Sequence, residues 1–326
     1  MAIITNQVNA TSLTNKQEDI VDAIYNADNR NTPFVNAIGT GMAHNVVHSW
    51  NTEEYADNDF SPSVYGYQPS QATAPTSGSL ETNYISEVTE EPVVTDAAEA
   101  TKGYGLKGGR MAHEIRNKTV ELRAQVEKGA LGNQDPNAGN GTTQATVMRG
   151  LPSWAKTTAF INAGQGGGNG STTAGRTDAA NENMREFTEQ QLVSLLSEME
   201  SEVKEPDTIV INPRQAQSMV GFSGKAAVFK DANGEKGDFI DFYLSPTGNK
   251  LKVLPTRHCR TRDVHVIRSD MHKIVYLEKS GVKVMDLGRT GTATRKQLSV
   301  KFTLEVLAPK GNGGIFDVTY PNQTFS

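Results

Sequence analysis

A pair of histidines is the first feature of this sequence whose spacing could support chemistry. His44 and His48 are four residues apart, which on a helix would place both rings on one side, as a metal ion requires. The alternation of Val46, His48 and Trp50 instead favours a strand, where the pair would need a third ligand from elsewhere. We therefore expect ordinary polar or packed histidines here, and likewise at His258, His265 and His272.

Three other features resemble reactive or ligand-binding sites. The glycine-rich stretch 164–170 lacks the spacing of a dinucleotide or Walker loop, so it predicts a surface loop. Cys259 has basic neighbours that could lower a thiol pKa, but no Asn or Asp partner can be assigned to it. Residues 231–235 resemble the start of a calcium loop, but the glycine comes two positions early and the distal glutamate is missing, which favours a hairpin turn. We expect no catalytic residue, cofactor or metal, although an enzyme with a dispersed site would show the same absence.

Length and composition limit the class of protein. The 326 residues exceed a usual single domain and predict two packed domains or one domain with large insertions. The start, MAIITNQVNATSLTNKQ, lacks the basic and apolar regions of a signal peptide, and no apolar run approaches the roughly 18 residues of a membrane span. The single cysteine excludes an internal disulfide and suits a reducing cytoplasm. We expect neither secretion nor a membrane partner.

Charge is distributed unevenly along the chain. The formal net charge is only −5, but no Lys or Arg occurs between Asn45 and Thr101. The acidic residues of this stretch are Glu53, Glu54, Asp57, Asp59, Glu81, Glu87, Glu90, Glu91, Asp96 and Glu99. The rest of the chain is correspondingly basic, above all the segments 108–131 and 250–310. Such an asymmetry predicts that surfaces of opposite sign meet.

The elements expected in the first part of the chain form an arm and a hairpin. A capping box at Thr14 and Gln17 predicts a helix over 15–27, and Thr32-Pro33 starts a second short helix that ends at Gly39. Alternating residues predict strands over 44–50 and 83–89, with a long Ser-, Thr- and Pro-rich tip between them. A two-stranded hairpin is marginal in water alone, so this one must dock on something or stay mobile.

The remaining chain predicts an α+β fold. Apolar residues at helical spacing among Arg and Lys predict a long helix over 108–131 with one basic face. A second capping box at Thr188 and Gln191 starts a helix that ends at Pro206, and a buried strand over 208–211 and an Asn-Pro helix to about Val220 follow. The last third changes to strand periodicity over 264–267, 273–277, 282–285 and 298–306.

Several segments, in order, resemble the major capsid proteins of tailed bacteriophages with the Hong Kong 97 fold, and most closely the SU10-type major head protein family. They are Asn31-Thr-Pro-Phe34, Ile38-Gly-Thr-Gly-Met-Ala43, Trp50, EIRNKTVELRAQVEKGALGN at 114–133, Arg149-Gly-Leu-Pro-Ser-Trp154, FTEQQLVSLLSEMESEVKEPDTIVINPRQAQSM at 187–219 and Thr290-Gly-Thr-Ala-Thr-Arg295 with Leu298 to Leu307. Each motif alone is weak, and their collinearity over nearly the whole chain carries the resemblance.

The resemblance implies a division of the chain into five parts. These are an N-terminal arm (1–43), an extended β-hairpin loop (44–104), a spine helix with the first part of a peripheral domain (105–148), an axial domain (149–287, with crossings to the peripheral domain near its ends), and the closing strand of the peripheral domain with the C-terminus (288–326).

The resemblance also implies a function and a set of partners. The chain would self-assemble as hexamers and pentamers into an icosahedral shell around double-stranded DNA, which it would contact without sequence specificity. Separate scaffolding and portal proteins, and a cement protein, would assist assembly in the bacterial cytoplasm before the subunit resides in the virion. An encapsulin-like nanocompartment shell is the alternative with the same fold, and a soluble enzyme with a dispersed site is the alternative of another class.

The charge asymmetry and the resemblance together predict how subunits meet. We expect the acidic, aromatic hairpin of one subunit to contact the basic helix of its neighbour. The residues predicted to lie between subunits are Trp50, Glu53, Glu54, Tyr65, Tyr67, Glu87, Glu90, Glu91, Arg110, Arg116 and Arg123. The founding member of the fold joins its subunits by an isopeptide bond from a lysine in this loop. Because no lysine occurs between Asn45 and Thr101 here, we expect a shell without covalent crosslinks.

Overall fold

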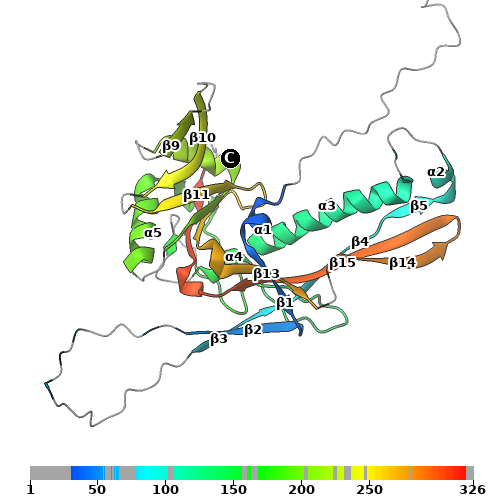
Figure 1. Ribbon diagram of the computed structural model, residues 1–326, viewed down its shortest axis with the longest axis horizontal. Coiled ribbons are helices and arrows are strands. Elements are labelled where there is room, and N and C mark those ends of the chain that lie inside the picture. The colour runs from blue at the N-terminus through cyan, green and yellow to red at the C-terminus, as the bar shows by residue number, and fades with distance from the viewer. Residues whose placement is uncertain are drawn as a thin grey trace, which may run out of the picture.

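The structure, a computed structural model of the 326-residue chain, describes residues 31–53, 55, 60, 62, 64, 65, 78–101, 106, 108–155, 160–162, 168–201, 205–222, 226–230, 236–245, 248–278 and 281–320. Two β-sheets organise these residues (Figure 1). The six-stranded sheet contains β1 (Gly39–Ala43), β4 (Ser86–Glu90), β5 (Val93–Thr95), β13 (His272–Leu277), β14 (Lys283–Thr290) and β15 (Ala293–Val306). The seven-stranded sheet has the order β6 (Phe160–Asn162), β16 (Gly313–Phe316), β12 (Asp263–Ile267), β8 (Thr208–Ile211), β11 (Lys250–Pro255), β10 (Lys236–Leu244) and β9 (Ala226–Lys230).

The long helix α3 (Arg110–Leu131) and the six-stranded sheet form one elongated part of the molecule (Figure 1). With 22 residues the helix is about 33 Å long. Its buried stripe, Leu122, Val126 and Ala130, belongs to the same core as Val300 and Phe302 of β15. The helix lies close to the sheet at Gly129, where an added Cβ would lie 3.0 Å from Met148 and 3.3 Å from Phe302. The basic helix predicted from the sequence therefore packs along the six-stranded sheet.

Strand β15 holds the six-stranded sheet together because both of its edges are paired. One edge pairs with β13 and then β14, and the other pairs with β4 and then β5. The sequence alternation predicts one exposed face, and the first part of the strand is indeed only half-buried. From Phe302 to Val306 every residue is buried, because the base of the hairpin formed by β2 (Val47–Thr52) and β3 (Ser79–Tyr84) packs here.

The seven-stranded sheet carries a second core with helices beside it. Helix α5 (Glu189–Ser201) begins at the predicted capping box, in which the Thr188 backbone amide donates to Gln191 Oε1 at 3.1 Å and the Gln191 amide donates to Thr188 Oγ1 at 3.4 Å. Helix α6 (Pro213–Val220) begins with Asn212 as its cap, whose Oδ1 accepts from the Arg214 amide at 3.0 Å. Central strand β8 is buried throughout, as predicted. The short elements are α1 (Pro33–Ala37), α2 (Asp96–Ala100), α4 (Leu151–Trp154), and β7 (Arg185–Glu186) paired with β17 (Val318–Thr319).

The structure departs from the expected boundaries in two places. The hairpin pairs residues 47–52 with 79–84, and the chain then leaves it, so that β4 and β5 belong to the six-stranded sheet rather than to the hairpin. The chain after β15 does not stay with that sheet, because β16 pairs with β12 in the seven-stranded sheet. The expected boundary at residues 287 and 288 also falls inside β14. The helix predicted over 15–27 lies outside the described residues.

Candidate intersubunit surfaces

The base of the hairpin is anchored on its own subunit. Trp50 is 9% exposed, its indole Nε1 donates to the Val306 carbonyl at 2.9 Å, and its ring lies 5.5 Å from that of Trp154. The buried Asn83 amide donates to the carbonyls of Arg149 and Leu304, at 3.1 and 2.7 Å. Because Trp50 is used inside the subunit, its placement differs from the expected contact with a neighbour.

Two histidines connect the hairpin to the six-stranded sheet. His48 Nε2 lies 2.6 Å from Glu305 Oε2, in a pair that is mostly shielded from solvent. His44 Nδ1 lies 2.8 Å from Glu278 Oε2, in an exposed pair. These two histidines thus have carboxylate partners on different strands and do not converge on a metal ion. The pairs add to the contacts that set the direction in which the hairpin leaves the body.

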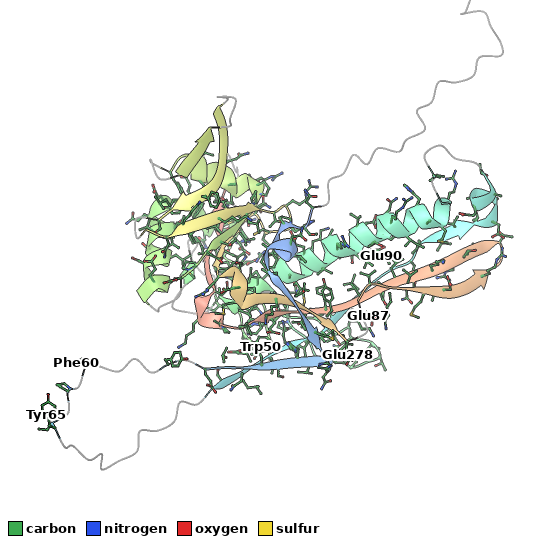
Figure 2. The ribbon with its side chains drawn as sticks, in the orientation of Figure 1. Trp50, Phe60, Tyr65, Glu87, Glu90 and Glu278 are labelled. Atoms are coloured by element: carbon green, nitrogen blue, oxygen red, sulfur yellow. The ribbon has the colours of Figure 1, made fainter. Side chains whose placement is uncertain are left out.

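The far end of the hairpin presents aromatic side chains to solvent. Tyr55, Phe60 and Tyr65 are almost completely exposed, at 104%, 94% and 106%. Figure 2 shows Phe60 and Tyr65 well away from both sheets, at the opposite end of the hairpin from Trp50. Glu53, near the start of this end, is exposed, and Glu54 and Tyr67 lie outside the described residues. Large exposed apolar side chains that are grouped together mark contact surfaces.

The other predicted acidic residues have cationic partners within the same chain. Glu87 pairs with Lys301 at 3.4 Å, and Glu91 pairs with Arg295 at 2.9 Å. Glu90 pairs with Lys118 of α3 at 3.2 Å. At these three positions opposite charges thus meet inside one subunit, and the predicted meeting of opposite charges between subunits stays a prediction. Each such pair contributes only about 0.2–1 kcal/mol.

The basic face of α3 is open over part of its length. Arg116, Val120 and Arg123 are exposed at helical spacing, so they form one stripe. Arg110, in the first turn, is half-buried. Lys118 turns to the sheet side, where it pairs with Glu90 and Glu121. The three predicted arginines therefore lie along α3, and the two nearer its middle face solvent.

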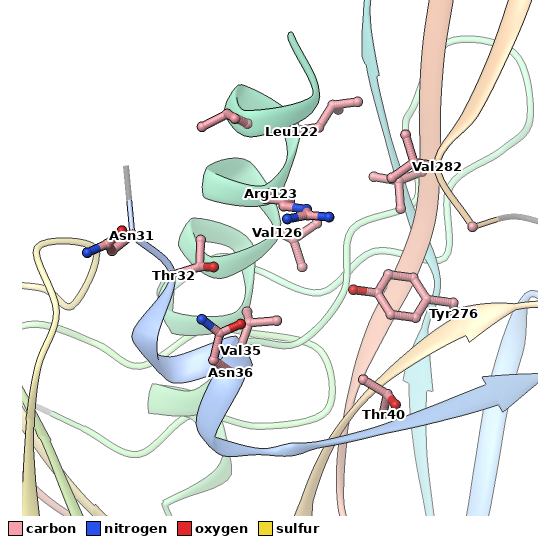
Figure 3. A pocket seen from close by; sticks show the side chains of 13 residues that line it. Asn31, Thr32, Val35, Asn36, Thr40, Leu122, Arg123, Val126, Tyr276 and Val282 are labelled. Atoms are coloured by element: carbon pink, nitrogen blue, oxygen red, sulfur yellow. The ribbon is translucent and has the colours of Figure 1, made fainter. Parts of the chain in front are cut away.

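A groove of about 730 Å³ lies between α1, α3 and the six-stranded sheet (Figure 3). Its apolar walls come from Val35 of α1, Val120 and Val126 of α3, Tyr276 of β13 and Val282. Arg123 contributes a charged wall, and Asn31 and Thr32, where the described chain begins, lie at its edge. No pattern in the sequence predicts this groove, because its walls come from distant segments: Val35 and Val120 are 85 residues apart, and Val120 and Tyr276 are 156 apart.

The groups considered for chemistry are placed as structural side chains. Cys259 is buried, and burial raises the pKa of its thiol well above the ordinary value, which disfavours a thiolate nucleophile. Burial lowers the pKa of His265 to about 3, and the pKa of His272 is lowered for the same reason. Within the described ranges no three His, Cys, Asp or Glu side chains are placed to hold a metal ion, and no helix is long and apolar enough to span a membrane. Residues 163–167 and 231–235 lie outside those ranges.

Two sets of buried charged side chains were not predicted from the sequence. Arg176 and Arg262 both pair with the buried Asp317, at 2.9 and 2.6 Å, and Arg260 pairs with the buried Asp263 at 3.1 Å. Separately, the buried Glu127 of α3 accepts the backbone amides of Phe34 and Val35 at 3.1 and 3.3 Å and the hydroxyl of Thr256. Asp317 and its partners are 55 to 141 residues apart, and Glu127 and its partners are 92 to 129 apart, so no local signal could reveal these contacts, whereas Arg260 and Asp263 are only three residues apart.

Comparison with solved structures identifies the fold. The capsid of an empty GTA particle matches with a TM-score of 0.60 at 11% identity, over 96% of this chain and 100% of that chain. The structure of Mycobacterium phage Adephagia matches with a TM-score of 0.57 at 13% identity, over 97% and 100%. The encapsulin complex of Synechococcus elongatus PCC 7942 matches with a TM-score of 0.56 at 12% identity, over 90% and 91%. The mixed helix and sheet architecture is thus the Hong Kong 97 fold.

The family assignment rests on the sequence as a whole. No curated protein matches the chain. The family model described as SU10 major capsid protein matches residues 3–319, which is nearly the entire sequence. This extent agrees with the collinear motifs and with the fold, and it makes the subunit a self-assembling structural component of a virion. The chain therefore belongs to the SU10 major capsid protein family.

Proposed function

We propose that the chain forms hexamers and pentamers that close into an icosahedral shell around packaged double-stranded DNA, and that it has no enzymatic activity. Assembly takes place in the bacterial cytoplasm with separate scaffolding, portal and, where used, cement proteins. The observation that carries the proposal is the hairpin, which is anchored at its base by Trp50 and exposes Tyr55, Phe60 and Tyr65 beyond the body of its own subunit.

The anchored base and the exposed end together suit a contact with a neighbour. Burying one large side chain contributes roughly 1.5–3 kcal/mol, so the three aromatic residues supply a moderate driving force at each contact. In a ring every subunit both gives and receives a hairpin, and closure adds the contacts together. The anchored base lowers the conformational entropy that the hairpin loses when it docks.

Charge gives this contact a direction. In our proposal Glu53 and Glu54 of the hairpin face the arginines of a neighbouring α3, Arg110, Arg116 and Arg123. Glu87, Glu90 and Glu91 have cations in their own subunit and act as a second acidic line beside the contact. Tyr65 and Tyr67 supply apolar area next to the charges. Contact with DNA is indirect and independent of base sequence, since the net charge of the chain is −5.

The aromatic hairpin is tested by replacing Tyr55, Phe60 and Tyr65 together with serine. We expect folded subunits with unchanged circular dichroism that no longer form closed shells in electron micrographs. The matched control replaces Val220 and Leu244, which are exposed at 48% and 51% elsewhere on the subunit, with serine. Shells that assemble as well in the triple variant as in the control would contradict the proposed role of the hairpin.

The contents of the particles distinguish a virion from a nanocompartment. The fold is shared with an encapsulin complex, so architecture alone does not decide between the two. We expect particles from infected cells to contain double-stranded DNA that is protected from nuclease. Particles that enclose a single folded protein in place of nucleic acid would contradict the proposal.

The absence of lysine from Asn45 to Thr101 argues for a shell without covalent crosslinks. An isopeptide bond from this segment would need a lysine amine, and none is available. Denaturing electrophoresis of mature particles should therefore give one band at the 35.3 kDa of the monomer. A ladder of covalent multimers would contradict this part of the proposal.

A further inference from the structure

We propose that residues 175–179 form a pH-sensitive strap between the C-terminal end of α3 and the seven-stranded sheet, and that Asp263 loosens this strap at alkaline pH by drawing Arg260 away from Asp178. The inference concerns the single subunit and does not depend on how shells assemble. It assigns a role to a buried charge cluster that the proposed intersubunit contacts do not use.

One side of the strap is attached to the chain that follows α3. Asn133, two residues after the helix ends, accepts the Arg176 backbone amide at 2.6 Å and donates to the Arg176 carbonyl at 2.7 Å. Asp135 accepts the Gly175 amide at 2.7 Å. These hydrogen bonds fix the backbone of the strap to the end of the long helix.

The other side of the strap is attached to the seven-stranded sheet through charged side chains. The buried Arg176 pairs at 2.9 Å with Asp317, which follows β16 directly, and Asp317 also accepts the Ala179 amide at 3.1 Å. Asp178 accepts a hydrogen bond from Arg260, in the loop between β11 and β12. The strap therefore joins α3 to the sheet, and part of this joint is an ion pair.

Two carboxylates compete for Arg260. Its Nη2 atom donates to Asp178, and its Nη1 atom lies 3.1 Å from Asp263 Oδ2 without hydrogen-bond geometry. Asp263 is fully buried, and neither of its side-chain oxygens accepts a hydrogen bond from any residue that the structure describes. A buried carboxylate that is ionised and lacks donors is costly. An ionised Asp263 therefore recruits the guanidinium beside it.

The charge of Asp263 changes near neutral pH. Burial raises the pKa of its carboxyl group to about 7, against the attraction of Arg260 and Arg176 and with further repulsion from Asp178 and Asp317. In acid the carboxyl group is protonated, and Arg260 stays on the strap. In alkali it is ionised and competes for Arg260, so the strap is tight below about pH 7 and looser above it.

The other ionisable side chains of the cluster do not reverse this direction. Burial raises the pKa of the Cys259 thiol well above its ordinary value and lowers the pKa of His265 to about 3, so both are neutral at neutral pH. Arg262 pairs with Asp317 at 2.6 Å and lies 3.7 Å from Asp178. Because Arg262 stays near the strap when Arg260 turns away, we expect loosening of the strap and not its release.

Hydrogen exchange of unassembled subunits tests the proposal. Exchange of residues 175–179 is divided by exchange of residues 137–147, a loop closed by its own backbone bridge, because the chemical effect of pH is common to both segments. The ratio should rise at least about threefold between about pH 6 and about pH 8.5. A ratio that stays constant over this range would overturn the proposal.

Two substitutions separate the strap from the general stability of the subunit. Asp178→Asn removes the carboxylate with which Asp263 competes, so exchange of 175–179 should be fast at both pH values and the ratio nearly independent of pH. Asp286→Asn, at an exposed carboxylate of β14, is the control and should keep the pH dependence of the unmodified protein. A pH dependence that survives in Asp178→Asn would come from the fold as a whole and would overturn the proposal.

A third substitution fixes the neutral state of the competing group. Asp263→Asn cannot ionise, so residues 175–179 should exchange slowly at both pH values. Fast exchange at alkaline pH in a folded Asp263→Asn subunit would also overturn the proposal. If this variant does not fold, the pH series of the unmodified protein and of Asp178→Asn still decides the question.

Discussion

At the scale of single residues, the buried carboxylate Asp263 links stability to pH. Asp263 is fully buried beside Arg260 and Arg176, with Asp178 and Asp317 also nearby. Burial outweighs the attraction of the arginines and raises the pKa of Asp263 to about 7. The carboxyl group therefore binds a proton more tightly in the folded chain than in the unfolded chain.

This pKa predicts a dependence of stability on pH. The ordinary pKa is 3.8, so the contribution of Asp263 is fully present at acidic pH and is lost as the pH rises through about 7. Between pH 5 and pH 8 the free energy of unfolding should fall by on the order of 3 kcal/mol because of this group. In Asp263→Asn the fall should be smaller by that amount, as measured by urea denaturation of unassembled subunits. Identical pH profiles for the two proteins would refute the assignment.

A second prediction concerns Glu127, which lies near the C-terminal end of α3 and caps α1. Glu127→Ala leaves the Phe34 and Val35 amides and the Thr256 hydroxyl without their acceptor, and it should lower the free energy of unfolding by about 3 kcal/mol. Glu127→Gln keeps one acceptor oxygen and should cost roughly 1 kcal/mol. Urea denaturation at pH 7 measures both variants. Equal losses would show that the side chain acts through its volume and not through its oxygens.

Sequence reasoning succeeded for residues with local partners and failed for those with distant ones. Thr188 and Asn212 cap helices that begin one residue later, so their roles can be predicted from neighbouring residues. Glu127 and Asp317 bind segments far away in the chain. A buried carboxylate and a solvated one have the same sequence signal, and only the folded structure shows which is which.

At the scale of elements, the contact between α3 and β15 holds the helix against the six-stranded sheet. Gly129 allows the helix to approach Met148 and Phe302 closely. This glycine is in the last turns of the helix, where alanine would otherwise be preferred by about 1 kcal/mol. Close packing therefore outweighs helix propensity at this position.

Replacing Gly129 with leucine tests this contact. The new side chain would overlap Met148 and Phe302, and overpacking of this kind costs about 1–3 kcal/mol. Lys128→Leu is the control, because Lys128 is exposed one position earlier on the same helix. We expect the midpoint of thermal unfolding of unassembled subunits to fall in Gly129→Leu and to stay nearly unchanged in Lys128→Leu. A similar midpoint in both would mean that the helix does not press on the sheet here.

The existence of the strands, but not all of their pairings, could be predicted. The sequence predicts a single strand over residues 83–89, and nothing local shows that Tyr84 ends one strand and Ser86 begins another. The switch occurs because Ser86 to Glu90 pair with residues 298–302, where Lys301 lies opposite Glu87. A pairing partner more than 200 residues away leaves no trace in the alternation itself.

At the scale of the whole molecule, the acidic residues that are predicted at subunit contacts fall into two groups. The acidic residues of β4 and of the segment after it have cationic partners on α3 and β15. Glu53 comes shortly before Tyr55, Phe60 and Tyr65 in the sequence and is exposed like them, whereas Glu54 lies outside the described residues. The collinear motifs predicted the family and the order of elements, since these depend on local sequence. Which acidic residues have cationic partners inside the subunit depends on the fold, so this could not be predicted from local sequence.

This separation predicts that two groups of acidic residues affect different properties. Glu53→Gln with Glu54→Gln should weaken assembly at low salt and reduce its dependence on salt, because screening acts on charges that meet between subunits. Glu87→Gln, Glu90→Gln and Glu91→Gln together should leave that dependence nearly unchanged and lower subunit stability by about 1–2 kcal/mol, since their partners lie in the same chain. Light scattering over a salt series measures the first effect, and urea denaturation measures the second. If neutralising all five residues leaves both assembly and its salt dependence unchanged, electrostatic docking between subunits is wrong, and apolar contacts alone must hold the hairpin in place.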